Sequence, residues 1–95
     1  MNDPIRHRVA IDYCTGCNWL LRAGWMAQEL LSSLSDHLEE VALRPGSGGV
    51  FRVTVNDQVV WDRTVDEGFP PIAELKRRVR DRVAPDWDLG HLDRA

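Results

Sequence analysis

Hydrophobic and polar residues alternate in three short stretches of the chain: 8–13, 38–43 and 51–55. Because neighbouring side chains of a strand point to opposite faces of a sheet, this period of two predicts three strands. A fourth apolar stretch, 58–61, follows the third after the pair Asn56-Asp57. Both residue types tolerate the positive φ angles of a tight turn, so the sequence predicts a β-hairpin from 51–55 to 58–61.

Two other segments repeat their hydrophobic residues every three or four positions. In the first segment, from about Gly16 to Ser33, these are Leu20, Ala23, Ala27, Leu30, Leu31 and Leu34. In the second they are Ile72, Leu75, Val79 and Val83. Such spacing places side chains on one face of a helix, so it predicts two amphipathic helices. Pro71 suits the first turn of the second helix, and Pro85 ends it.

The predicted elements follow one another as β-α-β-β-(β)-α, a thioredoxin-like α/β order with a mixed sheet and two helices. The right-handed crossover rule makes the first two strands parallel, and the hairpin adds antiparallel strands to the same sheet. With 95 residues, 43% of them hydrophobic, the chain suffices for one core and not for two. We therefore expect a single domain over 1–95, with an irregular tail at about 86–95.

The chain has only two cysteines, Cys14 and Cys17, at the point where the first strand leads into the first helix. A CxxC pair at such a turn is typical of a reversible dithiol/disulfide site. We expect both sulfurs in the first turn of the helix, where free amides and the helix dipole favour a thiolate over a thiol. The thiolate is the form that attacks disulfides. These residues therefore predict thiol–disulfide chemistry.

Two alternative roles for the cysteines stay open. A tetrahedral zinc site needs four ligands, and one CxxC supplies two. The other candidate ligands are His7, His37 and His91, but a second paired motif is missing, so we predict no metal site. The second alternative is a pair of inert, reduced core thiols, which is unusual for cysteines at this spacing on a strand-to-helix turn.

Three residues near the cysteines allow two interpretations each. Asp12 is either a proton acceptor for a departing thiol or a solvent-facing strand residue, and the face that it shares with Arg8 favours the second. Trp19 and Trp25 either line a hydrophobic rim around the CxxC or belong to the core, as aromatic residues at helical spacing usually do.

Charge gives further limits on partners and location. The net charge is −3, which provides no general attraction to nucleic acid or to an anionic membrane. The second predicted helix is nevertheless basic, and we expect an acidic protein partner there; its cations are Lys76, Arg77, Arg78, Arg80 and Arg82. No stretch approaches the roughly 18 apolar residues that span a bilayer, and residues 1–6 lack the apolar region of a signal peptide. We therefore expect a cytoplasmic protein whose partners are protein disulfides or small thiols.

Motifs along nearly the whole chain, about Val9 to Leu92, resemble the selenoprotein W, T and H family, the Rdx group of thioredoxin-like proteins. The matching residues are Tyr13-Cys14-Thr15-Gly16-Cys17, Trp19, Arg22-Ala23, Gly49 to Val55, Trp61, Gly68-Phe69-Pro70, Leu75 to Asp81 and Gly90-His91. In the selenium-containing members the motif is CxxU, so the resemblance assigns the selenocysteine position to Cys17. A thiol there starts from a pKa of about 8.5, which implies slower or narrower peroxide chemistry than a selenol gives.

The candidate catalytic residues are Cys14 and Cys17. Candidates for support or substrate contact are Tyr13, Thr15, Gly16, Trp19, Gly49 and Phe51. Placement at the turn favours Cys14 as the exposed, attacking thiol, whereas the resemblance favours Cys17, which we prefer. Where thioredoxins carry a cis-proline opposite the dithiol, this chain has Gly48-Gly49, which provides no fixed wall for a substrate.

Two functions follow as hypotheses. The first is a thiol–disulfide oxidoreductase in cell redox homeostasis, in which one cysteine attacks a disulfide and the other resolves the mixed disulfide. It needs no cofactor, although a low-molecular-weight thiol such as glutathione is a possible co-substrate. The second is a redox-responsive binding module that changes its affinity for a protein partner without turnover.

Overall fold

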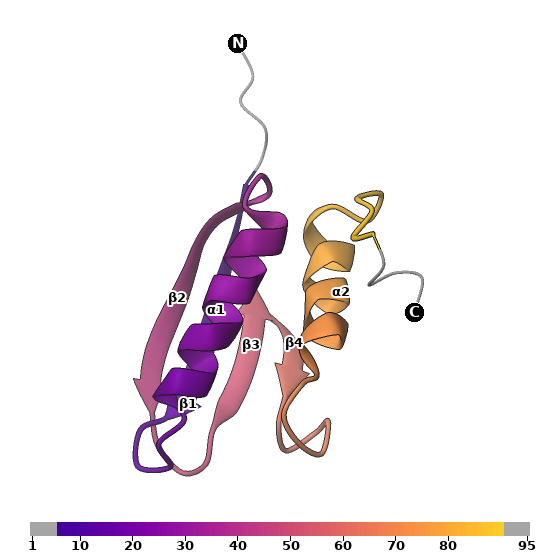
Figure 1. The fold of residues 1–95 in the computed structure, drawn as a ribbon. Helices are drawn as coiled ribbons and strands as arrows, with labels where there is room; N and C mark the ends of the chain where they lie inside the picture. The colour runs from indigo at the N-terminus through magenta and orange to yellow at the C-terminus, as the bar shows by residue number, and fades with distance from the viewer. Residues whose placement is uncertain (1–5, 91–95) are drawn as a thin grey trace.

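The computed structural model describes residues 6–90 and contains a mixed sheet and two helices (Figure 1). The elements are β1 (His7–Cys14), α1 (Leu20–Leu34), β2 (Leu38–Gly46), β3 (Phe51–Val55), β4 (Gln58–Asp62) and α2 (Ile72–Val83). The sheet order is β2-β1-β3-β4. Strands β1 and β2 are parallel, and β3 is antiparallel to both β1 and β4. The predicted thioredoxin-like α/β fold is therefore confirmed, and 58–61 does form a strand.

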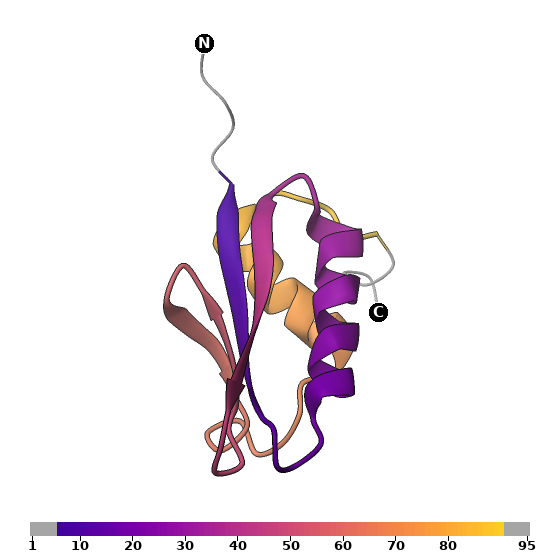
Figure 2. The same ribbon diagram turned by 90° about the vertical axis from the view of Figure 1, so that its left-hand side faces the viewer.

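Both helices cover the same face of the sheet and leave the other face open (Figure 2). The core lies between these two layers, because the hydrophobic positions of the strands point toward the helices. Its largest fully buried side chains are Val9, Ile11, Met26, Leu30, Leu34, Leu38, Phe51, Val53, Leu75 and Val79. Lys76 of α2, which is nearly buried, joins the two helices by a 2.8 Å ion pair with Glu29 of α1.

The hairpin turn between β3 and β4 has the predicted form. Asn56 and Asp57 both have positive φ angles, 49° and 70°. Two consecutive residues in this region match the right-handed twist of the flanking strands. The Asn56 side chain also accepts a 3.0 Å hydrogen bond from the backbone N–H of Arg8, which fixes the turn to β1.

Two predicted boundaries are wrong. The first helix begins at Leu20 and not at Gly16, because residues 15–18 form a turn in which Asn18 has a φ of 61°, outside the helical region. Strand β2 continues to Gly46 instead of ending at Leu43, since residues 44–46 still pair with the end of β1. Pro45 is compatible with this pairing because β2 is an edge strand.

The chain after α2 is described as far as Gly90. Trp87 lies there against His37, with ring centroids 4.7 Å apart. The predicted tail 86–95 and the candidate ligand His91 lie partly or wholly outside the described residues. Within 6–90, no helix combines the length and the hydrophobicity that crossing a membrane requires.

Candidate functional site: the CxxC turn

The CxxC motif forms the turn that connects β1 to α1. Cys14 is the last residue of β1, and Cys17 lies three positions later, in the turn. The two are paired as a disulfide, with their Cα atoms 5.3 Å apart. This separation lies within the usual range for disulfides. The structure therefore shows that the backbone brings both sulfurs together.

Backbone hydrogen bonds hold the turn against the end of β2. Both the N–H and the hydroxyl of Thr15 donate to the Gly46 carbonyl, at 3.1 and 3.2 Å. The Asn18 N–H donates to the Thr15 carbonyl at 3.1 Å and closes the turn. A side chain at Gly46 would place its Cβ 2.9 Å from Cγ1 of Val50. Gly46 is thus an anchor of the CxxC turn, although its sequence context, Pro-Gly-Ser-Gly-Gly, indicates only a loop.

The two cysteines differ in exposure, and the difference is opposite to the one expected from placement. Cys14 is only 3% exposed, whereas Cys17 is half-buried. Cys14 is buried because it ends an interior strand of the sheet, beside Gly46 of β2. A molecule that approaches the disulfide therefore meets Cys17 first. The expectation that both sulfurs lie in the first helical turn is also wrong, since Asn18 and Trp19 separate Cys17 from the start of α1.

An aromatic cluster lies next to the turn, formed by Trp19, Phe51 and Phe69. Trp19 packs edge-to-face on Phe69 at 4.8 Å and on Phe51 at 6.4 Å, and Phe51 packs on Phe69 at 5.0 Å. Such pairs are favoured by the opposite charges of ring edge and ring face. The cluster joins the end of the CxxC turn, the start of β3 and the segment before α2. Trp19 is thus packed against the core, whereas Trp25 is 47% exposed.

Two arginines border this cluster. The Arg22 guanidinium lies 4.0 Å from the centroid of Phe69, and that of Arg63 lies 4.9 Å from the centroid of Trp19. Arg63 also donates to the Gly49 carbonyl at 3.3 Å. Gly49 has a φ of 76°, so its place in the turn between β2 and β3 suits glycine. Arg22 occurs in the motifs of the resemblance, but nothing in the sequence distinguishes Arg63.

The remaining candidates occupy different places. Tyr13 is buried beside the turn, and Gly16 is exposed within it, where a side chain would meet no atom within 4 Å. Asp12 is engaged on the open face of the sheet, where its carboxylate accepts two hydrogen bonds from Arg44, at 2.8 and 2.9 Å. The bond to Asp12 raises the pKa of Arg44. This ion pair supports the surface role of Asp12.

The structure offers no metal site within the residues that it describes. No group of three or more His, Cys, Asp or Glu side chains in 6–90 lies close enough to hold an ion. His7 is hydrogen-bonded to Asn56, with 2.7 Å between Nδ1 and Nδ2. His37 lies against Trp87.

A cavity of about 440 Å³ lies directly beside the CxxC turn. Its walls come from the end of β1, the turn and the start of α1: Tyr13, Thr15, Asn18, Leu20 and Leu21. None of these side chains is charged. Thr15 and Asn18 of the CxxC turn thus border an uncharged, partly apolar cavity, although neither cysteine lines it.

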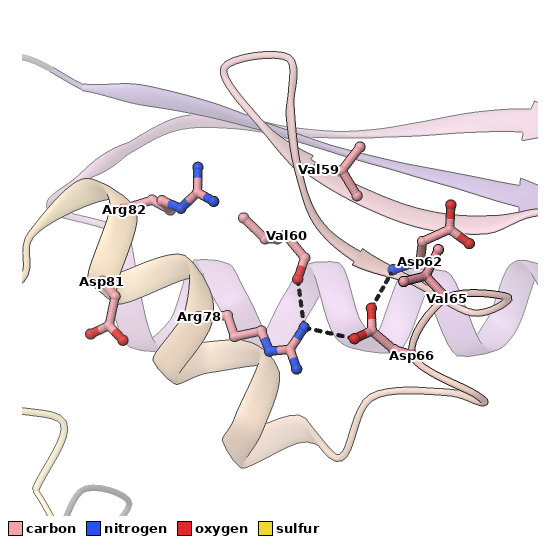
Figure 3. A pocket seen from close by; sticks show the side chains of 8 residues that line it. All are labelled: Val59, Val60, Asp62, Val65, Asp66, Arg78, Asp81 and Arg82. Atoms are coloured by element: carbon pink, nitrogen blue, oxygen red, sulfur yellow. Dashed lines mark hydrogen bonds and ion pairs between the residues drawn. The ribbon is translucent and has the colours of Figure 1, made fainter.

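A larger cavity, of about 630 Å³, lies between β4 and α2 and contains no residue of the CxxC turn (Figure 3). Arg78 crosses it and donates to the Val60 carbonyl at 2.9 Å and to the Asp66 carboxylate at 3.2 Å. Asp66 in turn accepts from the backbone N–H of Asp62 at 2.9 Å. These bonds satisfy backbone groups of edge strand β4, which is how proteins protect an edge from further pairing. Size alone therefore does not identify the reactive site.

Cations of α2 already have partners within the chain. Besides the Lys76 and Arg78 contacts, Arg80 binds Asp81 at 2.7 Å and Arg82 donates to the Gln58 side chain at 2.6 Å. The acidic protein partner stays a prediction.

A CxxC disulfide at the first strand-to-helix connection of a mixed sheet with two helices defines a small thioredoxin-like protein with a redox motif. The chain belongs to the Rdx family, whose sequence model matches residues 8–81. The predicted resemblance to the Rdx group is thus confirmed. Family membership and the paired cysteines together indicate a redox function.

Two solved structures show the same fold. One is a protein of Bordetella parapertussis, with 60% identity, a TM-score of 0.81, and coverage of 82% of this chain and 99% of that one. The other is a selenoprotein W-related protein of Vibrio cholerae, with 44% identity, a TM-score of 0.79, and coverage of 81% and 96%. A search of curated proteins gives no match.

Proposed function

We propose that the protein is a thiol–disulfide oxidoreductase in which Cys17 attacks and Cys14 resolves. The observation that carries this proposal is the unequal exposure of a pair of cysteines already at disulfide distance. Cys17 is half-buried at the surface, whereas Cys14 is 3% exposed and has its Cα 5.3 Å away. An accessible attacking thiol with a protected resolving thiol is the arrangement that two-step disulfide exchange requires.

The chemistry takes two exchange steps. The Cys17 thiolate attacks one sulfur of a substrate disulfide, a bond forms between these two sulfurs, and the other substrate sulfur leaves as a thiolate that takes up a proton. Cys14, after losing its proton to solvent, attacks Cys17 Sγ and displaces the second substrate thiolate. The substrate gains two electrons, and the CxxC becomes a disulfide. Two molecules of a low-molecular-weight thiol such as glutathione then reduce the CxxC and leave as their own disulfide.

The residues around the two cysteines also support disulfide exchange at this turn. The Thr15 bonds to Gly46 hold the turn without using either sulfur, so we expect the backbone to keep its place when the disulfide is reduced. The aromatic cluster holds the following residue, Trp19, against the core. A fixed backbone lets the sulfurs separate and rejoin without unfolding. A function in cell redox homeostasis in the cytoplasm is the corresponding physiological proposal.

Two single substitutions test the assignment. With 2-hydroxyethyl disulfide as substrate and glutathione as reductant, Cys17→Ser should abolish turnover. Reduced Cys14→Ser, mixed with 2-hydroxyethyl disulfide without glutathione, should still attack and should accumulate a mixed disulfide on Cys17, visible by mass spectrometry; glutathione is left out because it would release the adduct. The Cys14→Ser/Cys17→Ser double variant gives the background rate.

The opposite pattern would reverse the assignment, with the adduct on Cys14 in the Cys17→Ser variant. A wild-type rate no higher than that of the double variant would remove the enzyme proposal. The redox-responsive binding module would then be the function to test.

A further inference from the structure

Large apolar side chains are exposed where α1 leaves the CxxC turn. Leu20 is 49% exposed, Leu21 85% and Trp25 47%. Leu21 and Trp25 are four positions apart on the helix, so they lie on the same side of it. We call Leu20, Leu21 and Trp25 the apolar surface of α1. Burial in the fold does not explain these residues, and exposed apolar side chains that gather in one place often mark an interaction site.

The apolar surface is continuous with the cavity beside the disulfide. Leu20 and Leu21 form part of the wall of that cavity, together with Tyr13, Thr15 and Asn18. Thr15 lies between the two cysteines in the chain, and Asn18 directly follows Cys17. Cys17 itself does not line the cavity, so the groups that reach the cavity and the apolar surface are those beside the sulfur that bonds to Cys17.

We propose that the substrates of Cys17 are polypeptides whose disulfide-bonded cysteine has a large apolar neighbour, which occupies this cavity. This proposal rests on the oxidoreductase function proposed above. The volume of about 440 Å³ lies in the range of ligand-binding clefts and accommodates a large side chain together with adjoining backbone. The lining carries no charge, so it provides no ion pair for the carboxylates of a small anionic disulfide.

The contacts of the nearby arginines support the same choice. The two nearby guanidinium groups, of Arg22 and Arg63, lie over the rings of Phe69 and Trp19 and are not among the residues that line the cavity. An apolar peptide side chain gains by leaving water in this cavity, whereas a charged group would lose its hydration there without a partner.

The test compares two short peptides that differ only beside the cysteine, one with leucine neighbours and one with serine neighbours. Each is supplied as a mixed disulfide with 5-thio-2-nitrobenzoate, whose low thiol pKa makes it the leaving group, so colour release reports attack on the peptide sulfur. For the reduced wild-type protein we expect the leucine peptide to react about tenfold faster. This is the lower end of the ratio that burial of one leucine-sized side chain gives, as for a side chain that is only partly buried.

Two matched variants locate the effect. Leu21→Ser should bring the rate ratio of the two peptides close to one. Val65→Ser should keep the wild-type ratio, because Val65 is similarly exposed, at 77%, but belongs to the cavity between β4 and α2 (Figure 3). Rates with 2-hydroxyethyl disulfide give the reference for the chemistry in each variant.

The outcomes separate this inference from the function on which it rests. Equal rates for both peptides with wild-type protein that reduces 2-hydroxyethyl disulfide would overturn the inference alone. An equal loss of selectivity in both variants would do the same. A Cys17→Ser variant that keeps turnover would instead overturn the proposed function. Sedimentation analysis tests whether a second copy of the chain covers the apolar surface instead. A wild-type dimer that Leu21→Ser dissociates, together with no peptide selectivity, would overturn the inference and assign the surface to that second copy.

Discussion

Reduction of the Cys14–Cys17 disulfide should leave the protein folded and only modestly less stable. The bond closes a ring of just four residues, from Cys14 to Cys17. A disulfide stabilises a fold mainly by restricting the unfolded chain, and this effect grows with the size of the ring. A redox site must remain folded in both states, whereas a structural disulfide holds together a fold that is unstable without it.

The size of the effect follows from the ring. The chain-entropy relation gives about 1.9 kcal/mol for a ring of four residues. Although Cys14 is buried, neither cysteine belongs to the cluster of buried side chains that the helices and the sheet form. With a urea dependence of about 1–3 kcal/mol per molar, reduction should lower the unfolding midpoint by about 0.6–1.9 M.

Urea unfolding followed by far-ultraviolet circular dichroism, with and without dithiothreitol, measures this shift. A Cys17→Ala variant is the matched control, because reductant cannot change its covalent structure and its midpoint should not move. Unfolding of the wild-type protein on reduction, or a loss of 4 kcal/mol or more, would refute the reasoning and make the bond a structural one.

Three further predictions concern the fold around the site. Phe51→Ala should lower the unfolding free energy by about 3–5 kcal/mol, because Phe51 is fully buried and contacts two other rings. Val59→Ala should change it little, because Val59 is exposed. Equal urea midpoints for the two variants would contradict this. Asp62→Asn should destabilise the protein at neutral pH, because a hydrogen bond from Arg52 lowers the pKa of Asp62 in the folded state. The stabilisation begins to fade near the ordinary pKa of about 4 and is lost as the pH falls through the lowered pKa of the folded state. A gap in unfolding free energy that stays constant with pH would exclude this cause. Gly46→Ala should displace the CxxC turn and lower the melting temperature, because the alanine Cβ would lie 2.9 Å from Cγ1 of Val50. Adding Val50→Ala to the same chain should restore part of the loss. If it restores nothing, this contact is not the reason for the loss.

The strand and helix pattern was predictable because most elements bury mainly one face, although Thr54 of β3 is buried as well as its neighbours Val53 and Val55. The hairpin turn in particular follows from local chemistry, because asparagine and aspartate tolerate positive φ angles, which Asn56 and Asp57 adopt here. The start of α1 was not predictable in this way. Leu20 and its successors repeat with the helical period, but the period does not show that Asn18 adopts a left-handed conformation and delays the helix.

The sequence predicted which residues form the site, but not how buried they are or which residues from other elements contact them. The spacing of the cysteines indicates their chemistry, but their unequal exposure depends on the position of β1 inside the sheet. Arg63 lies near the site and donates a hydrogen bond to the Gly49 carbonyl. Gly46, at the end of β2, accepts hydrogen bonds from Thr15 of the CxxC turn. Such contacts between distant parts of the chain leave no period or spacing in the sequence.

The reduction potential of the Cys14/Cys17 pair tests the central claim most directly. The protein is equilibrated with a series of glutathione redox buffers, alkylated, and analysed by the mass shift of the free thiols. We expect a reversible two-electron transition between about −300 and −180 mV, the range of working cellular dithiols. A pair that never forms the intramolecular disulfide, or one that the glutathione series cannot reduce, would contradict a redox function of the CxxC turn.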